Sequence, residues 1–342
     1  MMIVEDSCTI LQTWETGDAG TSEEAAMESI NRPPSGREAR RAQANRDELA
    51  ERVARAVGKD GAIEAPGGLS LVRRSSPTPK DHGVSSPAFC MIAQGSKEVL
   101  LGDDRYRYDA DHYLLTAAAL PTATRVTEAS EERPYLGVVL GLDPALVGSV
   151  MVEASHAAPR EHVAVRAFQV SPLDAGLLDA VVRLVGLLDS PADEARFLRP
   201  LLTQEIVFRL LKGEQGDRIR QIAFLGGHGH RIAKALERLR KDFDRPLRIE
   251  DIAGEVGMSV SGFHHHFRAI TAMSPLQFQK RMRLQEARHL MLAEDLDAAS
   301  AGYRVGYGDA SQFNREYKRL FGAPPMRDVE QLREAAMEST PL

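Results

Sequence analysis

Three consecutive histidines, His264 to His266, lie between two phenylalanines in the stretch GFHHHFRAI. Histidine is a frequent metal ligand and general base, so the trio could indicate a metal site, a catalytic site or neither. Zinc ligands that share one helix stand three or four residues apart, because only those spacings place them on one face. Three adjacent side chains of a helix point in three directions. The spacing therefore argues against a shared metal and favours a polar helix surface.

A helical projection of residues 260–270 separates an apolar stripe from a polar face. The stripe, which we expect to be buried, consists of Val260, Phe263, Phe267 and Ile270. His266 falls at its edge. The polar face, which we expect to be exposed, consists of Ser261, His264, His265 and Arg268. Such a face can reach the base edges and phosphates of DNA, although a merely solvated helix surface has the same composition.

The chain contains this pattern twice. The matching pairs are Phe263 with Phe313, Phe267 with Tyr317, and Pro275 with Pro325, each fifty residues apart. A glycine stands at the expected turn of each copy, Gly257 in the first and Gly306 in the second. Ser259 and Asp309 stand where an N-cap side chain accepts hydrogen bonds from the first free N–H groups of a helix. The sequence therefore predicts two similar hairpins of helix, turn and helix.

The second copy has a polar face of its own. Its apolar stripe is Phe313, Tyr317 and Leu320, and its expected outward face consists of Ser311, Gln312, Asn314, Arg315 and Lys318. Arginine, asparagine and glutamine are the side chains that read guanine and adenine with paired hydrogen bonds. The duplication favours DNA, rather than solvent alone, as the partner of both faces.

Charge is unevenly distributed along the 342 residues, whose formal net charge is −6. Residues 231–330 contain 17 Lys and Arg against 14 Asp and Glu, so this part carries a positive net charge and the rest a negative one. The stretch 268–288 is basic and contains Arg268, Lys280, Arg281, Arg283 and Arg288 against Glu286. A basic stretch is often just a solvated face, so it only supports a nucleic-acid partner.

The last third of the chain resembles the DNA-binding domain of the AraC/XylS family of bacterial transcription regulators. The likeness covers residues 231–330 and is carried by IEDIAGEVGMSVSGFHHHFRAITAMSPLQFQKRMRLQEARHLM and by VGYGDASQFNREYKRLFGAPP. It implies two helix-turn-helix units joined by a linker helix at 275–293, with their recognition helices in successive major grooves. The DNA-binding residues that it implies are those of the two outward faces. His265 departs from the longer Arg or Gln expected there, which shifts specificity toward the second unit.

The upstream part of the chain changes in character several times. Residues 1–36 are polar and predicted to be disordered, and residues 37–60 are predicted to form a helix. Residues 61–143 contain short β-rich runs between turn signals. Residues 144–229 return to a helical period, in AGLLDAVVRLVGLL and EARFLRPLLTQEIVFRLLKG, which either pack within one chain or form a dimer seam. Residues 331–342 are expected to form a C-terminal tail.

Residues 61–230 resemble the cupin-type N-terminal domain of one branch of the same family, through PAFCMIAQGSKEVLLGDDRYRYDADHYLLTAAALP. The likeness implies a domain that senses a small molecule or mediates dimerisation. The expected fold class is therefore α+β, with a cupin-like β-barrel, a helical linker and an all-α domain. Cys90, Tyr106 and Tyr108 are the effector or sensor candidates. Cys90 is either a small buried residue or an electrophile sensor, which requires a lowered pKa.

Catalytic residues, metals and cofactors are not predicted. Metal-binding cupins use an H-x-H pair with a distant Glu and His, whereas His82 and His112 each stand alone in the strand region. His228 and His230 do form H-x-H, but in the glycine-rich stretch LGGHGH, which predicts a turn. Two other classes of protein remain as alternatives to a regulator: a cupin-type metalloenzyme with a helical appendix, and a protein-interaction module.

We therefore expect a sequence-specific transcription regulator that acts on double-stranded DNA with RNA polymerase and responds to a small-molecule effector. A homodimer is left open. The chain has no apolar run long enough for a membrane span, no secretory pattern at its start and only two cysteines, which predicts a cytoplasmic protein without a membrane partner. The sequence identifies neither the effector nor the target genes, and it does not decide between an activator and a repressor.

Overall fold

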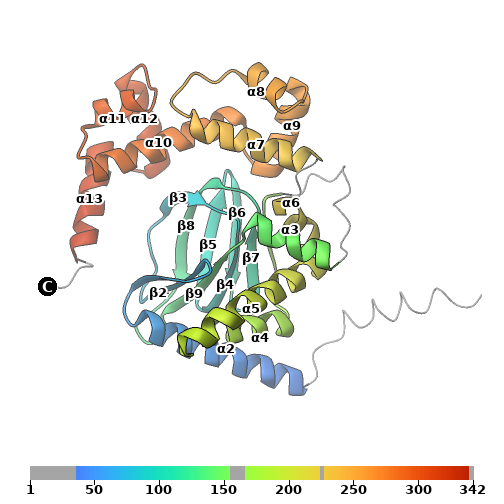
Figure 1. Cartoon of the computed structure of the whole chain (residues 1–342). Coiled ribbons are helices and arrows are strands. Elements are labelled where there is room, and N and C mark those ends of the chain that lie inside the picture. The colour runs from blue at the N-terminus through green and yellow to red at the C-terminus, as the bar shows by residue number, and fades with distance from the viewer. Residues whose placement is uncertain (1–35, 155–165, 224–226, 339–342) are drawn as a thin grey trace, which may run out of the picture. The chain divides into compact units, whose positions relative to one another are not determined.

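The computed structural model describes residues 36–154, 166–223 and 227–338 (Figure 1). The segment predicted to be disordered, residues 1–36, lies outside these ranges except for Gly36, and so does Cys8. The described residues confirm the predicted α+β class, because a region of strands and helices precedes a C-terminal region made of helices.

The strands form two antiparallel sheets. The six-stranded sheet has the order β1-β2-β9-β4-β7-β10, and the four-stranded sheet has the order β3-β8-β5-β6. Their bounds are β1 (Gly61–Ala65), β2 (Leu69–Arg74), β3 (Asp81–Ser85), β4 (Ala88–Gln94), β5 (Ser96–Leu101), β6 (Asp104–Asp109), β7 (His112–Thr116), β8 (Leu120–Glu128), β9 (Tyr135–Gly141) and β10 (Phe168–Pro172). We call residues 61–172 the β domain.

Strand β10 lies beyond residue 143, where the sequence pattern places the end of the strand region. It pairs antiparallel with β7, from Phe168 opposite Thr116 to Pro172 opposite His112. A five-residue strand whose partner stands far upstream has no adjacent hairpin to signal it, so the local pattern did not distinguish it from the surrounding helical stretch.

Side chains of the six-stranded sheet divide between two cores, because successive residues of a strand point to opposite faces. On one face, Phe89 and Val138 pack into a cluster with helices. On the other face, Ile92 and Leu114 pack into a cluster with Val99 of the four-stranded sheet. The two sheets therefore face each other across an apolar interior.

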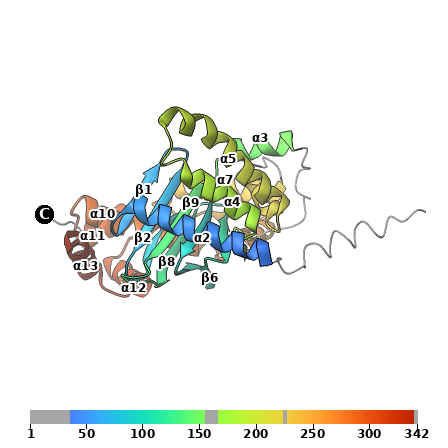
Figure 2. The same ribbon diagram turned by 90° about the horizontal axis from the view of Figure 1, so that it is seen from below.

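Helices α2 (Gly36–Val57), α4 (Ala175–Gly186) and α5 (Ala192–Lys212) lie across the helix-facing side of the six-stranded sheet (Figure 2). The shorter helices α3 (Pro144–Glu153) and α6 (Gly216–Ala223) pack against α5. Val181 on α4 and Ile206 on α5 are almost fully buried, so both helices pack within the chain. Helix α5 nevertheless exposes Phe197, whose exposed fraction is 72%, and Leu201, whose exposed fraction is 50%.

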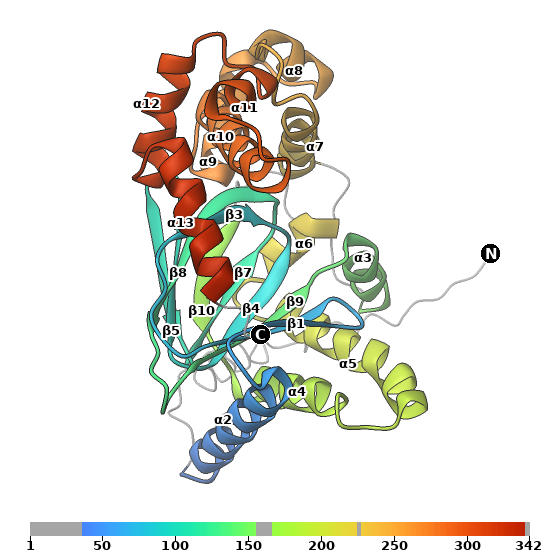
Figure 3. The ribbon, with the colours of Figure 1, turned by 90° about the vertical axis from the view of Figure 1, so that its left-hand side faces the viewer.

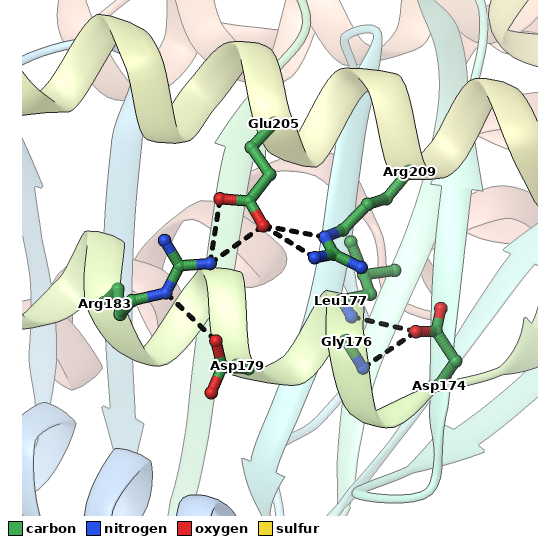
Figure 4. Close-up of polar contacts among 7 residues, drawn as sticks. All are labelled: Asp174, Gly176, Leu177, Asp179, Arg183, Glu205 and Arg209. Carbon is green, nitrogen blue, oxygen red and sulfur yellow. Dashed lines mark hydrogen bonds and ion pairs between the residues drawn. The ribbon is translucent and has the colours of Figure 1, made fainter.

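Charged side chains connect α4 to α5 (Figure 4). The Arg183 guanidinium donates to Asp179 on its own helix at 3.0 Å and to both carboxylate oxygens of Glu205 on α5 at 2.8 Å. Arg209 donates to the same carboxylate at 2.9 Å. The start of α4 is fixed separately, since the Asp174 carboxylate caps it by accepting from the first backbone N–H groups.

The C-terminal helical domain, residues 227–338, contains α7 (Gly227–Lys241), α8 (Ile249–Glu255), α9 (Val260–Thr271), α10 (Pro275–Ala293), α11 (Ala298–Arg304), α12 (Ala310–Phe321) and α13 (Pro325–Glu338). Two expectations need correction. Residues 227–230, which carry His228 and His230, form the first turn of α7 instead of a glycine-rich turn. Helix α13 continues to Glu338, past the predicted end of the domain at residue 330. None of the helices described is long and apolar enough to cross a membrane.

Replacing Glu205 with Gln tests the connection between α4 and α5. We expect Glu205→Gln to lower the free energy of unfolding by about 0.5–1 kcal/mol, because both arginines are more than one third exposed and water screens the pair. Urea unfolding followed by circular dichroism measures this change, with Glu237→Gln on α7, where the glutamate is exposed, as the matched control. A loss that does not shrink in high salt would contradict the electrostatic origin.

Candidate nucleic-acid interface

The first helix-turn-helix unit consists of α8 and α9. Between them Gly257 has a φ of 66°, a left-handed conformation that glycine adopts without strain. The N–H of Met258 then donates back to the carbonyl of Ala253 at 2.8 Å, which closes the turn. Helix α9 starts where the Ser259 hydroxyl accepts from the N–H of Gly262 at 3.1 Å. The predicted glycine turn and N-cap are both confirmed.

The second unit, α11 and α12, repeats this geometry. Gly306 has a φ of 88°, and the N–H of Tyr307 donates to the carbonyl of Gly302 at 3.0 Å. The Asp309 carboxylate caps α12 by accepting from the N–H groups of Ser311 at 2.9 Å and Gln312 at 3.3 Å. The two predicted hairpins thus share the position of the turn, the closing hydrogen bond and the cap.

Each copy also includes a third helix. Pro275 starts α10 and Pro325 starts α13, so the prolines that recur in the sequence both mark a helix start, where a missing N–H costs nothing. The Ser274 hydroxyl and the Gln277 side chain form a reciprocal capping box at the start of α10. Figure 3 shows α10, α11, α12 and α13 within the C-terminal helical domain.

Aromatic side chains form the core of both units. Phe263, Phe267, Phe313 and Tyr317 are fully buried. The rings of Phe263 and Phe267 lie 5.4 Å apart, and those of Phe313 and Tyr317 lie 5.5 Å apart. Val260 is an exception to the predicted stripe, because its exposed fraction is 39%. It is the first residue of α9, one turn before the core begins at Phe263.

The structure places every residue predicted for the two outward faces at the surface. The exposed residues are Ser261, His264, His265 and Arg268 on α9, and Ser311, Gln312, Asn314, Arg315 and Lys318 on α12. Arg268, Arg315 and Lys318 form no ion pair with any residue in the described ranges. Three cations on two N-capped helices are therefore available to an external anion.

The other cations of the basic stretch have internal partners, which corrects their use as support for DNA binding. Arg283 on α10 donates to the carbonyls of Phe243, Asp244 and Arg245 at 2.6, 3.1 and 2.8 Å. It also donates to the carbonyl of Gly306 at 2.8 Å. One guanidinium thus joins the segment that precedes the first unit to the turn of the second.

Lys280 connects α10 to α12 through Glu316. The Lys280 ammonium and the Tyr307 hydroxyl both donate to the Glu316 carboxylate, at 2.7 and 2.8 Å. Burial alone would raise the pKa of Glu316, but hydrogen bonds from Lys280, Tyr307 and Gln312 together hold that pKa below its ordinary value. Glu316 is therefore ionised at neutral pH and keeps α12 attached to α10 and the turn.

Arg288 forms a buried pair with Asp328, which joins α10 to α13. The guanidinium donates to both carboxylate oxygens, at 2.8 and 2.9 Å, and the Tyr317 hydroxyl of α12 donates to the same carboxylate at 2.7 Å. The exposed fractions of the Arg288 and Asp328 side chains are 12% and 8%. Helices α10, α12 and α13 thus share one carboxylate.

The residues of the β domain that the sequence suggested as effector or sensor residues differ in their surroundings. Cys90 on β4 belongs to the interior between the sheets, where burial raises the pKa of its thiol to about 11. A thiol with this pKa is protonated at neutral pH, whereas the sensor interpretation requires a thiolate. Tyr108 on β6 is buried in the same interior, and Tyr106 is half-buried. His82 and His112 lie on strands of different sheets, and no group of three metal-ligating side chains occurs in the described ranges.

Two family models match the chain. One is described as the AraC-type transcriptional regulator N-terminus and matches residues 66–218. The other is described as a helix-turn-helix domain and matches residues 252–331. The chain belongs to the AraC/XylS family. The helix-turn-helix match spans both units, from α8 to α13.

Curated relatives of this AraC/XylS-family chain include the HTH-type transcriptional activator RhaS. RhaS of Citrobacter koseri is 31% identical over 108 residues, which are 32% of this chain and 38% of RhaS. RhaS of Salmonella schwarzengrund is 27% identical over 165 residues, which are 47% of this chain and 57% of RhaS. Each match therefore spans less than two thirds of the relative.

A solved structure shows the same fold. The structure of ToxT from Vibrio cholerae O395, bound to (E)-4-(8-methylnaphthalen-1-yl)but-3-enoic acid, is 14% identical to this chain. The alignment covers 77% of this chain and 98% of ToxT, with a TM-score of 0.50. This AraC/XylS-family chain and ToxT therefore share an architecture.

Replacing Asp328 with Asn tests whether the shared carboxylate holds the second unit together. We expect Asp328→Asn to destabilise the C-terminal helical domain by about 3 kcal/mol, because it leaves the Arg288 guanidinium buried without its counter-ion. Hydrogen exchange of peptides from α12 and α13, followed by mass spectrometry, measures the loss of protection.

The matched control is Asp295→Asn, which removes the ion pair of Asp295 with Arg333. The Asp295 side chain is 83% exposed, so its loss should leave exchange unchanged. Equal exchange in the two variants would show that the Arg288–Asp328 pair has no special role.

Proposed function

We propose that this chain is a transcription regulator of the AraC/XylS type whose helices α9 and α12 bind successive major grooves of double-stranded DNA. The observation that carries the proposal is the set of exposed cations on the two N-capped helices that pair with no described residue, Arg268, Arg315 and Lys318. Such cations attract phosphates, and their polar neighbours on the same faces can reach base edges.

The side chains of the two outward faces differ in how well they can distinguish bases and contact phosphates. Arg315, Asn314 and Gln312 have the paired donors and acceptors that distinguish guanine and adenine in the major groove. Lys318 ends in a single ammonium, which suits a phosphate. On α9, His264 and His265 are shorter and offer fewer donors when neutral. We therefore assign most base discrimination to the second unit.

The effector is assigned to the β domain, whose interior lies between two sheets. A ligand there would control transcription only if it bound two states of the regulator with different affinity. The resemblance to curated relatives described as transcriptional activators supports activation, together with contact to RNA polymerase, in the cytoplasm. No catalytic role is part of this proposal.

Alanine substitutions on α12 test the division between base reading and phosphate contact. Arg315→Ala should lower affinity for the operator by about 1–3 kcal/mol and relax preference at one base pair. Lys318→Ala should weaken binding to all sequences alike and reduce the salt dependence of affinity by about one phosphate contact. Fluorescence anisotropy with operator and scrambled duplexes, at several salt concentrations, measures both.

The matched control is Arg333→Ala on α13, whose guanidinium donates to the carbonyl of Met291 and to Asp295. It removes an equal charge from outside the two outward faces and should leave base preference intact. If Arg315→Ala and Arg333→Ala changed operator affinity equally, base reading by Arg315 would be wrong.

The exposed side of α5 supports a second part of the proposal, a homodimer. Phe197, Leu201, Gln204 and Phe208 follow one another at spacings of four, three and four residues, so they form one ridge along the helix. Phe208 is 37% exposed, less than Phe197 and Leu201. An exposed apolar ridge of this length is typical of an interaction surface.

A second copy of the same helix fits this ridge when it lies antiparallel. With the two-fold axis between residues 202 and 203, Phe197 faces Phe208 of the other copy, and Leu201 faces Gln204. The same symmetry brings the exposed Glu194 near the exposed Lys212 of the other copy. The ridge is therefore complementary to itself in both apolar and charged positions.

A charge introduced on the ridge should separate the protomers. We expect Leu201→Asp to raise the dimer dissociation constant by roughly tenfold or more, because a carboxylate would be buried at the seam. Sedimentation equilibrium measures the constant, and Val152→Asp on α3, where the valine is 81% exposed, is the matched control.

Glu194→Lys should weaken the dimer, and the double variant with Lys212→Glu should restore it. A wild-type chain that stays monomeric would refute the seam.

A further inference from the structure

Lys97 of the β domain is half-buried and has no counter-ion among the residues that the structure describes. Lys97 lies on β5, where its neighbours across the four-stranded sheet are Tyr108 on β6 and Val126 on β8. Alternation along β5 places Val99 and Leu101 on the face of Lys97, and both are almost fully buried. Lys97 therefore extends from the four-stranded sheet into the interior between the two sheets.

The other face of β5 shows how this domain neutralises a buried charge. The Glu98 side chain, which is 4% exposed, pairs with Arg105 at 3.2 Å and with Arg125 at 2.9 Å. Lys97, one residue earlier, has neither an ion pair nor a hydrogen bond with any residue in the described ranges. Asp81 is near enough to act on Lys97 electrostatically, but it is exposed and does not pair with it.

The surroundings of Lys97 disfavour its charge. Burial lowers the pKa of its ammonium group from the ordinary value. A charged group in an apolar environment is destabilising unless it is paired, so a lysine kept in such a place without a partner indicates a functional site. The half-buried side chain is not sealed from solvent, which leaves access for a small molecule.

Two tyrosines share this interior with Lys97. Tyr108 and Tyr135 are each 4% exposed, and their hydroxyls form no hydrogen bond within the part of the chain that the structure describes. Gly137 leaves the room that the Tyr135 ring occupies, because a Cβ at that position would lie 2.6 Å from the Tyr135 hydroxyl oxygen. Tyr108 stands directly opposite Lys97 in the four-stranded sheet, and it shares one apolar cluster with Tyr135 and Cys90, so these groups lie near one another.

We propose that this interior binds a small, largely apolar molecule through a single carboxylate, with Lys97 as the ion-pair partner and the Tyr108 and Tyr135 hydroxyls as hydrogen-bond donors. One ammonium matches one negative charge. Arg74, the neighbouring cation, already donates to the carbonyls of Gly61 and Arg73, so a phosphate would lack the further charge it needs. The remaining lining, with Ile92, Leu114 and Val99, suits an apolar body.

This inference rests on the proposed function in one respect only, namely that the bound carboxylate-bearing molecule is the effector. Its binding is tested without DNA. Isothermal titration calorimetry of the full chain should be performed with benzoate and hexanoate, each compared with its neutral amide, benzamide or hexanamide. Each carboxylate should bind roughly tenfold or more tightly than its amide, because only the carboxylate pairs with Lys97. Equal binding of acid and amide, or no binding by either carboxylate, would overturn the proposal.

Substitution of Lys97 provides a second test of the carboxylate site. Lys97→Met keeps the length of the side chain and removes its charge, so it should abolish the preference for the carboxylate while amide binding persists. It should also raise the melting temperature of the ligand-free chain, since an unpaired buried charge is lost. The exposed Lys80→Met is the matched control and should change neither property.

Tyr135→Phe distinguishes a bound carboxylate from an adventitious ion near Lys97, because it should weaken the carboxylate alone by severalfold. A Lys97→Met chain that melts at a lower temperature and binds both carboxylates normally would assign Lys97 a structural role. DNA binding of the same variants is measured separately, so a failed carboxylate site leaves the DNA-binding proposal intact, and the reverse also holds.

Discussion

A fixed relation between α9 and α12 is the constraint on which the C-terminal helical domain depends. Two helices can read one duplex together only if their separation and rotation match successive turns of the groove. Helix α10 joins the units through the chain, and Arg283 joins them a second time by donating to carbonyls on both sides. Gly306 makes this contact possible, since a Cβ there would lie 2.0 Å from the Asp244 carbonyl oxygen.

The glycine of the second turn therefore has one function that the glycine of the first does not share. Both glycines adopt a positive φ, which the turn between two helices requires. At Gly257 no atom lies within 4 Å of a Cβ added to the backbone, whereas at Gly306 the backbone of Asp244, in the segment that precedes the first unit, occupies that space. A substitution at residue 257 would strain the turn alone, and one at residue 306 would also push the two units apart.

The cations of this domain separate into two sets with opposite roles. Lys280, Arg283 and Arg288 donate hydrogen bonds to internal carbonyls and carboxylates, and so they stabilise the arrangement of the helices. Arg268 and Arg315 extend outward without ion pairs among the described residues. The distinction explains how a chain with a net charge of −6 can present a nucleic-acid surface. Local placement of a few unpaired cations matters more than the total charge.

Sequence reasoning predicted the two helix-turn-helix units in detail because their signals are local. A positive-φ glycine, an N-cap and a buried aromatic stripe each depend on residues within one or two turns of helix, and the structure confirmed them for both copies. The outward faces followed from the same periodicity, and the structure exposes them, although their contacts with DNA stay a prediction. The sequence did not predict features that depend on distant residues. Strand β10 pairs with a strand far upstream. Arg283 was assigned to a basic surface, whereas it donates to backbone carbonyls of two separate segments.

Among the described residues, Glu98 and Lys97 of the β domain and Arg218 of α6 are charged groups that lie largely away from solvent, and comparing them separates structural from functional use. Glu98 is neutralised by two arginines. Arg218, 3% exposed, pairs with no carboxylate of the described residues, yet it donates to the carbonyl of Arg166 and to the side chains of Gln215 and Gln169. Burial lowers the pKa of Arg218 to about 10, so it keeps its charge at neutral pH. Both residues are satisfied by the fold itself.

Lys97 has neither an ion-pair partner nor a hydrogen-bond partner among the described residues. This has a thermodynamic consequence. A ligand that supplies the missing negative charge binds the folded chain and not the unfolded one, so it adds its binding free energy to stability. The ligand-free state bears the cost of the unpaired ammonium, while the liganded state recovers it. Because that difference is confined to the interior between the sheets, occupancy changes the energy of the β domain without any contact to DNA. Effector control requires in addition that the ligand bind two folded states of the regulator with different affinity.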